Sequence, residues 1–255
     1  MFLTDQFVFV HLPRTGGTFV TDVIRRFFPS VREIGHHLPL ELLPGEYRHL
    51  PILGTIRNPW DFYVSLYHYL ANNNSNTALA AWMSENGTVS FQESVRNLLN
   101  FGISTERLEA LIEILPEHVD YTKRQVPNIS KPTARRMRGR GIGYYSLRFE
   151  EMFGNVNNIF FCRLENLRND LVEFFEKIGT ATDALRDYVA LLDKQNTSAH
   201  LHYSTYYSKE LADLVLNRER PIIKKFGYQF EQPYSTHSFQ GISDLSLSKL
   251  TTNFS

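Results

Sequence analysis

The sequence has little of what marks secreted, membrane or nucleic-acid-binding proteins. Its 255 residues include one cysteine, Cys162, which excludes an internal disulfide and favours a reducing compartment. Lys and Arg together number 27, as do Asp and Glu, so there is no overall basic charge for nucleic acid or anionic membranes. No apolar run approaches the roughly 20 residues of a membrane span, and "MFLTDQFVFVH" lacks the features of a signal peptide. We therefore expect a cytoplasmic protein with no membrane span and no nucleic-acid partner.

Strand and helix patterns alternate at both ends of the chain. With 42% hydrophobic residues the chain can bury one substantial core, and we expect one domain over 1–255. The alternation, with short joints, predicts an α/β fold with a central parallel sheet. We predict strands at 7–12, 31–35, 49–57 and 155–164, and helices at 17–28, 59–71, 167–179 and 206–226, the last broken near Pro221.

The middle of the chain breaks this alternation. From the polar loop "NNNSNT" to about Arg140 the pattern is helical, with no strand. We interpret 72–145 as an inserted helical lid that shapes an acceptor site. The Ser- and Thr-rich stretch 235–255 is predicted to be an irregular tail.

The stretch "FVFVHLPRTGGTFVTDVI" reads as a buried strand, a tight turn and a helix start. Gly16 and Gly17 allow a ligand to approach the backbone closely, and the free N–H groups of the helix start favour an anion. Arg14 adds a permanent charge, while Thr15 and Thr18 add hydroxyl donors. The alternative is a structural glycine turn with a helix-capping threonine. The turn lacks the Gly-Lys pair of a Walker A loop.

A second motif, "GTIRNPWDFYVSLYHY", ends another predicted strand and begins a helix. Arg57 closes the strand, and Ser65 follows eight residues later. Because the carboxyl ends of parallel strands face the same crevice, we expect Arg57 to emerge beside Arg14 and to hold a second phosphate with Ser65. The alternative is an ion pair between Arg57 and Asp61 at the helix start.

Together, "PRTGGT" and "RNPWDFYVSLYHY" resemble the sulfotransferases that use 3′-phosphoadenosine 5′-phosphosulfate (PAPS), in particular the branch with bacterial and carbohydrate enzymes. "IFFCRLENL" and "NTSAHLHYSTYYSKELADLV…IIKKFGYQF" resemble further stretches of that family. The resemblance implies a P-loop NTPase-like three-layer sandwich and PAPS as co-substrate, with no metal. The first loop is expected to hold the 5′-phosphosulfate, and Arg57 with Ser65 the 3′-phosphate. The nucleotide contacts it implies are Arg14, Thr15, Gly16, Gly17, Thr18, Phe19, Arg57 and Ser65.

Arg14 is a departure from that family, whose loop often has lysine at this position. Arginine does not give up its proton in proteins, so Arg14 is expected to act electrostatically on the bridging oxygen. Since a nucleotide phosphate leaves readily without protonation, we expect this charge to suffice for catalysis.

The catalytic base is sought among histidines, whose pKa suits proton removal from a hydroxyl. "GHHLPLELL" places His36 and His37 after the predicted second strand. The family often has a histidine a few residues ahead of a glutamate, and by its spacing to Glu41 His36 is the first choice and His37 the second. On an extended segment the two side chains point in opposite directions, so one is expected to face the sulfur.

Weaker signals lie elsewhere. The stretch "NTSAHLHY" resembles family residues that line the crevice, which suggests Asn196, Ser198 and His200 as substrate contacts; a plain turn is the alternative. Earlier in the chain, basic residues cluster between Lys123 and Arg140. This cluster suits a solvated face, an additional clamp on the 3′-phosphate or a grip on an acidic acceptor. Nucleic-acid binding is a further alternative, disfavoured because the patch is short and the protein neutral.

These observations predict a sulfotransferase that acts by direct in-line transfer from PAPS to a hydroxyl of a glycan or small metabolite. A nucleotide kinase is disfavoured because it needs a Gly-Lys-Ser/Thr loop. The alternative is a non-catalytic nucleotide-binding or interaction protein on the same fold.

Overall fold

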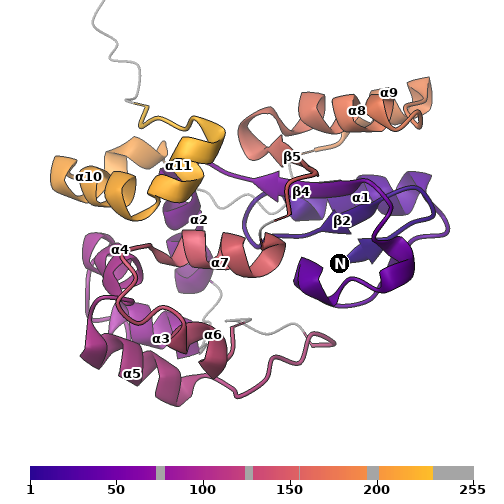
Figure 1. Cartoon of the computed structure of the whole chain (residues 1–255). Coiled ribbons are helices and arrows are strands. Elements are labelled where there is room, and N and C mark those ends of the chain that lie inside the picture. The colour runs from indigo at the N-terminus through magenta and orange to yellow at the C-terminus, as the bar shows by residue number, and fades with distance from the viewer. Residues whose placement is uncertain (73–77, 124–128, 155, 194–200, 232–255) are drawn as a thin grey trace, which may run out of the picture.

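A five-stranded sheet forms the centre of the molecule (Figure 1). The computed structural model describes residues 1–72, 78–123, 129–154, 156–193 and 201–231. The strand order is β3-β1-β2-β4-β5. The strands are β1 Phe2–Leu3, β2 Val8–Val10, β3 Arg32–Glu33, β4 Ile52–Ile56 and β5 Ile159–Arg163. β2, β4 and β5 are parallel, and β1 is antiparallel to both β2 and β3. Four strands therefore share one direction, which confirms the predicted central parallel sheet with one strand reversed.

Helices cover both faces of the sheet, because side chains along each strand alternate between two cores. Val8 and Val10 enter one core and Phe9 the other. The second core also contains Cys162, where burial raises the pKa of the thiol, as expected for a packing residue. Two cores around one sheet confirm the predicted three layers.

The core that contains Phe9 lies beneath α1 Gly17–Phe27, α8 Leu167–Lys177 and α9 Asp183–Leu191. The opposite core lies beneath α2 Pro59–Asn72, α7 Tyr144–Phe153, α10 Lys209–Arg218 and α11 Arg220–Phe226. Pro221 stands in the first turn of α11, so the break in the last predicted helix is confirmed. Short 3₁₀ helices occupy Leu40–Leu42, Gly45–Tyr47, Leu164–Asn166 and Tyr203–Tyr206.

The predicted helical insert corresponds to four helices that Figure 1 shows gathered away from the strands. They are α3 Ala78–Ser84, α4 Phe91–Asn100, α5 Thr105–Ile114 and α6 Lys131–Arg135. Within 78–123 and 129–143 the structure describes no strand. α7, which starts at Tyr144 inside the predicted insert, packs on the sheet instead, with the Phe153 ring 4.8 Å from that of Phe161 in β5.

Two expectations about strands need correction. The predicted second strand at 31–35 shrinks to the exposed pair Arg32–Glu33, which bonds antiparallel to β1 at the sheet edge. β1 was not expected, because two apolar residues are too few to show a period. The predicted tail, 235–255, lies outside the described residues. Among the helices of the described segments, none is long and apolar enough to cross a membrane.

Candidate functional site

The turn between β2 and α1 is held open by its two glycines. Gly16 takes a left-handed φ of 91°, and a Cβ on Gly17 would lie 1.9 Å from the Cδ2 atom of His11. The His11 ring is therefore packed directly against the first residue of α1. α1 has no side-chain cap and no acidic residue in its first turn. Its positive end is left without a compensating carboxylate of its own, as an anion site requires.

Arg14 lies in this turn with a half-buried side chain. Its φ of 63° is unusual for a residue with a side chain. The Nε and Nη2 atoms donate to the hydroxyl of Ser65 at 3.2 and 2.8 Å, and the guanidinium stacks on the Tyr69 ring at 4.5 Å. Burial, and then the charge of Arg57, lowers the pKa of Arg14 to about 10, so it stays cationic at neutral pH. In the described part of the chain, no carboxylate lies within 4.0 Å of it.

Arg57 emerges beside Arg14, as the parallel strands predict. Its Nε and Nη2 atoms both bond to the Asp61 carboxylate at 2.8 Å, and Nη1 donates to the Arg14 carbonyl at 3.2 Å. The ion pair with Asp61 that the sequence allowed is thus present. It fixes the direction of the guanidinium and leaves further N–H groups for a ligand.

The corner between β4 and α2 is fixed by residues from distant segments. The Asn58 N–H donates to the Glu165 carboxylate at 2.6 Å, and the Asn58 side chain donates to the Gln229 carbonyl at 3.1 Å. Burial raises the pKa of Glu165. Glu165 of the "RLENL" stretch therefore orients the backbone next to Arg57.

His11, His36 and His37 form a cluster beyond the carboxyl ends of β2 and β3, two strands that β1 separates in the sheet. The ring centroids of His36 and His37 are 3.8 Å apart, and those of His11 and His37 are 4.6 Å apart. His37 has a left-handed φ of 50°, so the segment is not extended there. The expectation that the two adjacent imidazoles point in opposite directions is therefore wrong. Across the described residues, no group of three or more His, Cys, Asp and Glu side chains is arranged to hold a metal ion.

One contact defines the tautomer of His37. Its Nδ1 atom lies 2.8 Å from the His11 carbonyl oxygen, which can only accept. Nδ1 therefore holds the proton, and Nε2 is left with a lone pair. Burial lowers the pKa of His37 well below its ordinary value, and the adjacent His11 and His36 lower it further. A neutral imidazole with an accepting Nε2 is the form that a general base needs.

Two predicted nucleotide contacts are engaged elsewhere. The Thr15 hydroxyl is buried, donates to the Leu12 carbonyl at 2.7 Å and lies 2.6 Å from the Thr55 hydroxyl. It is a structural hydroxyl and not the ligand donor that was expected. Phe19 is also in the core beneath the Arg168 guanidinium, and its N–H donates to the Gly16 carbonyl. The hydrophobic side chain faces the core because it continues the apolar face of α1.

The basic cluster of the insert is largely neutralised by carboxylates nearby. Arg138 pairs with Glu109, and Arg140 makes two bonds of 2.8 and 2.9 Å to Glu150. The other pairs are Lys123–Asp120, Lys131–Glu117 and Arg135–Glu117. This pattern fits a solvated charged face. Arg124, and the predicted substrate contacts Asn196, Ser198 and His200, lie outside the described residues.

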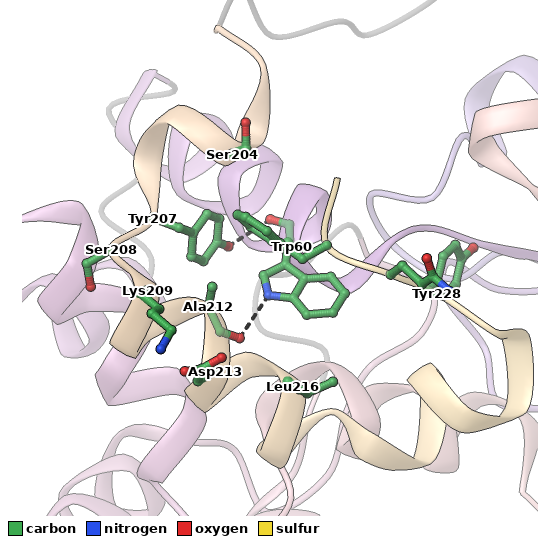
Figure 2. A pocket seen from close by; sticks show the side chains of 11 residues that line it. Trp60, Ser204, Tyr207, Ser208, Lys209, Ala212, Asp213, Leu216 and Tyr228 are labelled. Carbon is green, nitrogen blue, oxygen red and sulfur yellow. Dashed lines mark hydrogen bonds between the residues drawn. The ribbon is translucent and has the colours of Figure 1, made fainter. Parts of the chain in front are cut away.

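A pocket of about 430 Å³ opens at a different place, between α2, α10 and the segment after α11 (Figure 2). The Trp60 indole lies at its centre and donates to the Ala212 carbonyl at 3.0 Å. Lys209 and Asp213 of α10 stand on one side and Tyr228 on the other. None of the residues predicted for the site lines it. The pocket is therefore separate from the cluster of arginines and histidines.

Comparison with known proteins gives matches among solved structures. No family model and no curated protein sequence matches the chain. Among solved structures, it is similar to the crystal structure of mouse sulfotransferase SULT7A1 complexed with PAP. The match has 15% sequence identity and a TM-score of 0.47, and it covers 87% of this chain and 89% of the other.

Proposed function

We propose that this protein is a sulfotransferase that moves a sulfuryl group from PAPS to the hydroxyl of an acceptor. One observation supports this most: two arginines that follow adjacent parallel strands meet over a glycine turn, and the one carboxylate beside them, Asp61, pairs with Arg57. Arg14, a half-buried cation that no salt bridge of the described residues neutralises, favours a bound anion. A nucleotide with phosphate groups at both ends suits two adjacent guanidinium groups.

In this proposal the loop and the second motif divide the nucleotide between them. The backbone at Gly16, Gly17 and Thr18 receives the 5′-phosphosulfate at the start of α1. Arg57 and Ser65 receive the 3′-phosphate. Arg14 joins the two halves, since its backbone belongs to the turn and its side chain reaches Ser65. We expect its guanidinium to exchange the Ser65 hydroxyl for nucleotide oxygen when the ligand binds.

The reaction is a direct displacement at sulfur. The acceptor oxygen attacks the sulfur, the bond from sulfur to the bridging oxygen breaks, and 3′-phosphoadenosine 5′-phosphate (PAP) leaves. His37 takes the hydroxyl proton on Nε2, and Arg14 stabilises the negative charge that develops on the bridging oxygen. The Nδ1 contact of His37 supports His37 as the base, whereas spacing alone made His36 the first choice. The acceptor class remains a glycan or small-metabolite hydroxyl.

Calorimetric titration with PAP tests the nucleotide site. We expect wild-type protein to bind PAP and Arg57→Ala to bind it at least about tenfold more weakly, a loss of roughly 1.4 kcal/mol. Absence of any PAP binding by the wild type would refute the proposal.

Turnover with labelled PAPS and a panel of hydroxyl acceptors tests catalysis. Once an acceptor is found, His37→Ala should lose nearly all turnover while His36→Ala retains most of it. The reverse result would make His36 the base. PAP binding without transfer to any acceptor would instead support a non-catalytic nucleotide-binding protein.

A further inference from the structure

The backbone of Arg57 is held by a side chain from a distant helix. The last residue pair in the β4–β5 ladder is Ile56 with Arg163, so Arg57 lies just beyond the sheet bonds. Its N–H donates to the Tyr145 hydroxyl at 2.9 Å, and the same hydroxyl donates to the Arg57 carbonyl at 3.1 Å. One buried side chain thus satisfies both backbone groups of the residue proposed to hold the 3′-phosphate.

Tyr145 is itself fixed on two sides. Its ring stacks on Phe62 of α2 with centroids 3.8 Å apart and planes 9° from parallel. Its side chain is fully buried, and burial raises the pKa of the phenol well above its ordinary value, so the hydroxyl keeps its proton. A protonated hydroxyl is what the two bonds to Arg57 require, because it must donate one and accept the other.

A buried carboxylate anchors the start of the helix that presents Tyr145. Glu219 accepts from the Ser146 N–H at 2.8 Å, the Ser146 hydroxyl at 2.6 Å and the Tyr145 N–H at 3.3 Å. It also accepts from the Tyr63 hydroxyl of α2. A Cβ on Gly143 would lie 2.1 Å from the Glu219 Oε1 atom, so this glycine admits the carboxylate. The start of α7 is thereby tied to α2 and to the α10–α11 junction.

We propose that Tyr145 is a positioning residue that aims Arg57 and so sets the selectivity of the site for a nucleotide with a 3′-phosphate. This inference rests on the proposed function. From this backbone position the Arg57 guanidinium reaches the Arg14 carbonyl and Asp61. Loss of the Tyr145 hydroxyl would leave the Arg57 N–H and carbonyl buried without these partners, and the strand end would shift to find others.

The test compares PAP with adenosine 5′-monophosphate, which lacks the 3′-phosphate, by calorimetry on the full chain. The variants are Tyr145→Phe, which removes only the hydroxyl, and Tyr144→Phe as matched control. Tyr144 is the buried neighbour on the same helix, and its ring packs near Phe101. We expect Tyr145→Phe to weaken PAP binding about tenfold and to leave monophosphate binding within about twofold. Tyr144→Phe should keep the wild-type selectivity.

Each other outcome has a definite meaning. If wild-type protein does not prefer PAP over the monophosphate, the proposed function fails and this inference fails with it. If the wild type prefers PAP and Tyr145→Phe keeps that preference, the inference is wrong and the function stands. Equal weakening of both ligands would show a general structural role and also overturn it. Should Tyr145→Phe not fold, Ser146→Ala loosens the same helix start and must lower selectivity in the same direction.

Discussion

Arg14 has a left-handed backbone and a half-buried charge, two unfavourable features in one residue. Each of them opposes folding by an amount on the order of a kilocalorie per mole. The favourable contacts are with a neutral hydroxyl and an aromatic ring, which offset the loss of hydration only in part. Such a residue is expected where binding, and not stability, determines its identity.

We therefore expect Arg14→Ala to separate the two properties. PAP affinity should fall at least about tenfold, while the free energy of unfolding should change by less than about 0.5 kcal/mol or rise. Arg25→Ala, at an exposed arginine of α1 paired with Glu33, is the control and should change neither strongly. Calorimetry and urea unfolding measure the two quantities. A loss of stability with unchanged PAP affinity would make Arg14 a structural residue.

His37 should make stability depend on pH. Its pKa is lowered in the folded state by burial, so as pH falls through about 6.5 the unfolded chain binds a proton that the folded chain does not. Stability present above pH 6.5 is therefore lost on acidification, by up to about 1.4 kcal/mol at pH 5.5 for this one group.

His37→Asn is the matched variant, because asparagine tolerates the left-handed backbone and still offers an N–H toward the His11 carbonyl. Urea unfolding at pH 7.5 and pH 5.5 should show a smaller acid loss for this variant than for the wild type. Equal losses would mean that His37 titrates normally in the folded protein.

At the scale of elements, the β2–α1 turn depends on close packing between the Gly17 backbone and the His11 ring. Gly17 is the first residue of α1, and the His11 ring occupies the space that a Cβ on Gly17 would need. We expect Gly17→Ala to lower the free energy of unfolding by about 1–3 kcal/mol through overpacking. His11→Ala in the same chain should recover most of that loss, since it vacates the space.

Urea unfolding of the two single variants and the double variant gives the coupling between the sites. Gly45→Ala is the control, because no atom lies within 4 Å of a Cβ at that glycine. Additive losses in the double variant would contradict the packing described for the turn.

The long elements follow from periodicity in the sequence, and the short ones do not. α1, α2 and α8 were predicted because their apolar faces repeat over several turns. The existence of β2, β4 and β5 was predicted from apolar runs, although each is shorter than expected. β1 and α9 were missed, since a two-residue strand and a nine-residue helix offer few repeats.

The meeting of Arg14, Arg57 and Ser65 could also be predicted from local patterns in the sequence. Arg14, Arg57 and Ser65 belong to compact motifs at strand ends, and parallel strands bring such ends together. Tyr145 and Glu219 belong to no motif, and their roles arise from contacts 88 and 73 residues away in the chain. No local pattern in the sequence indicates such contacts.

At the scale of the whole molecule, Glu219 joins helices that are distant in sequence. It lies between α10 and α11 and accepts hydrogen bonds from α2 and α7. We expect Glu219→Gln to lower the free energy of unfolding by about 1–3 kcal/mol, because an amide nitrogen cannot accept and leaves a buried donor without a partner. Urea unfolding measures this, with the exposed Glu113→Gln as control. A change below about 0.5 kcal/mol, typical of surface substitutions, would contradict the network.

The sequence by itself determined the α/β class, the glycine turn and the meeting of Arg14 with Arg57, because strand ends and turn chemistry are local properties that parallel pairing brings to one edge. Only the tertiary structure decided the tautomer of His37, the burial of the Thr15 hydroxyl against Leu12 and Thr55, and the hydrogen bonds between Tyr145 and the Arg57 backbone. These depend on which buried atoms of distant segments come within hydrogen-bond reach, and that is a property of the packed core.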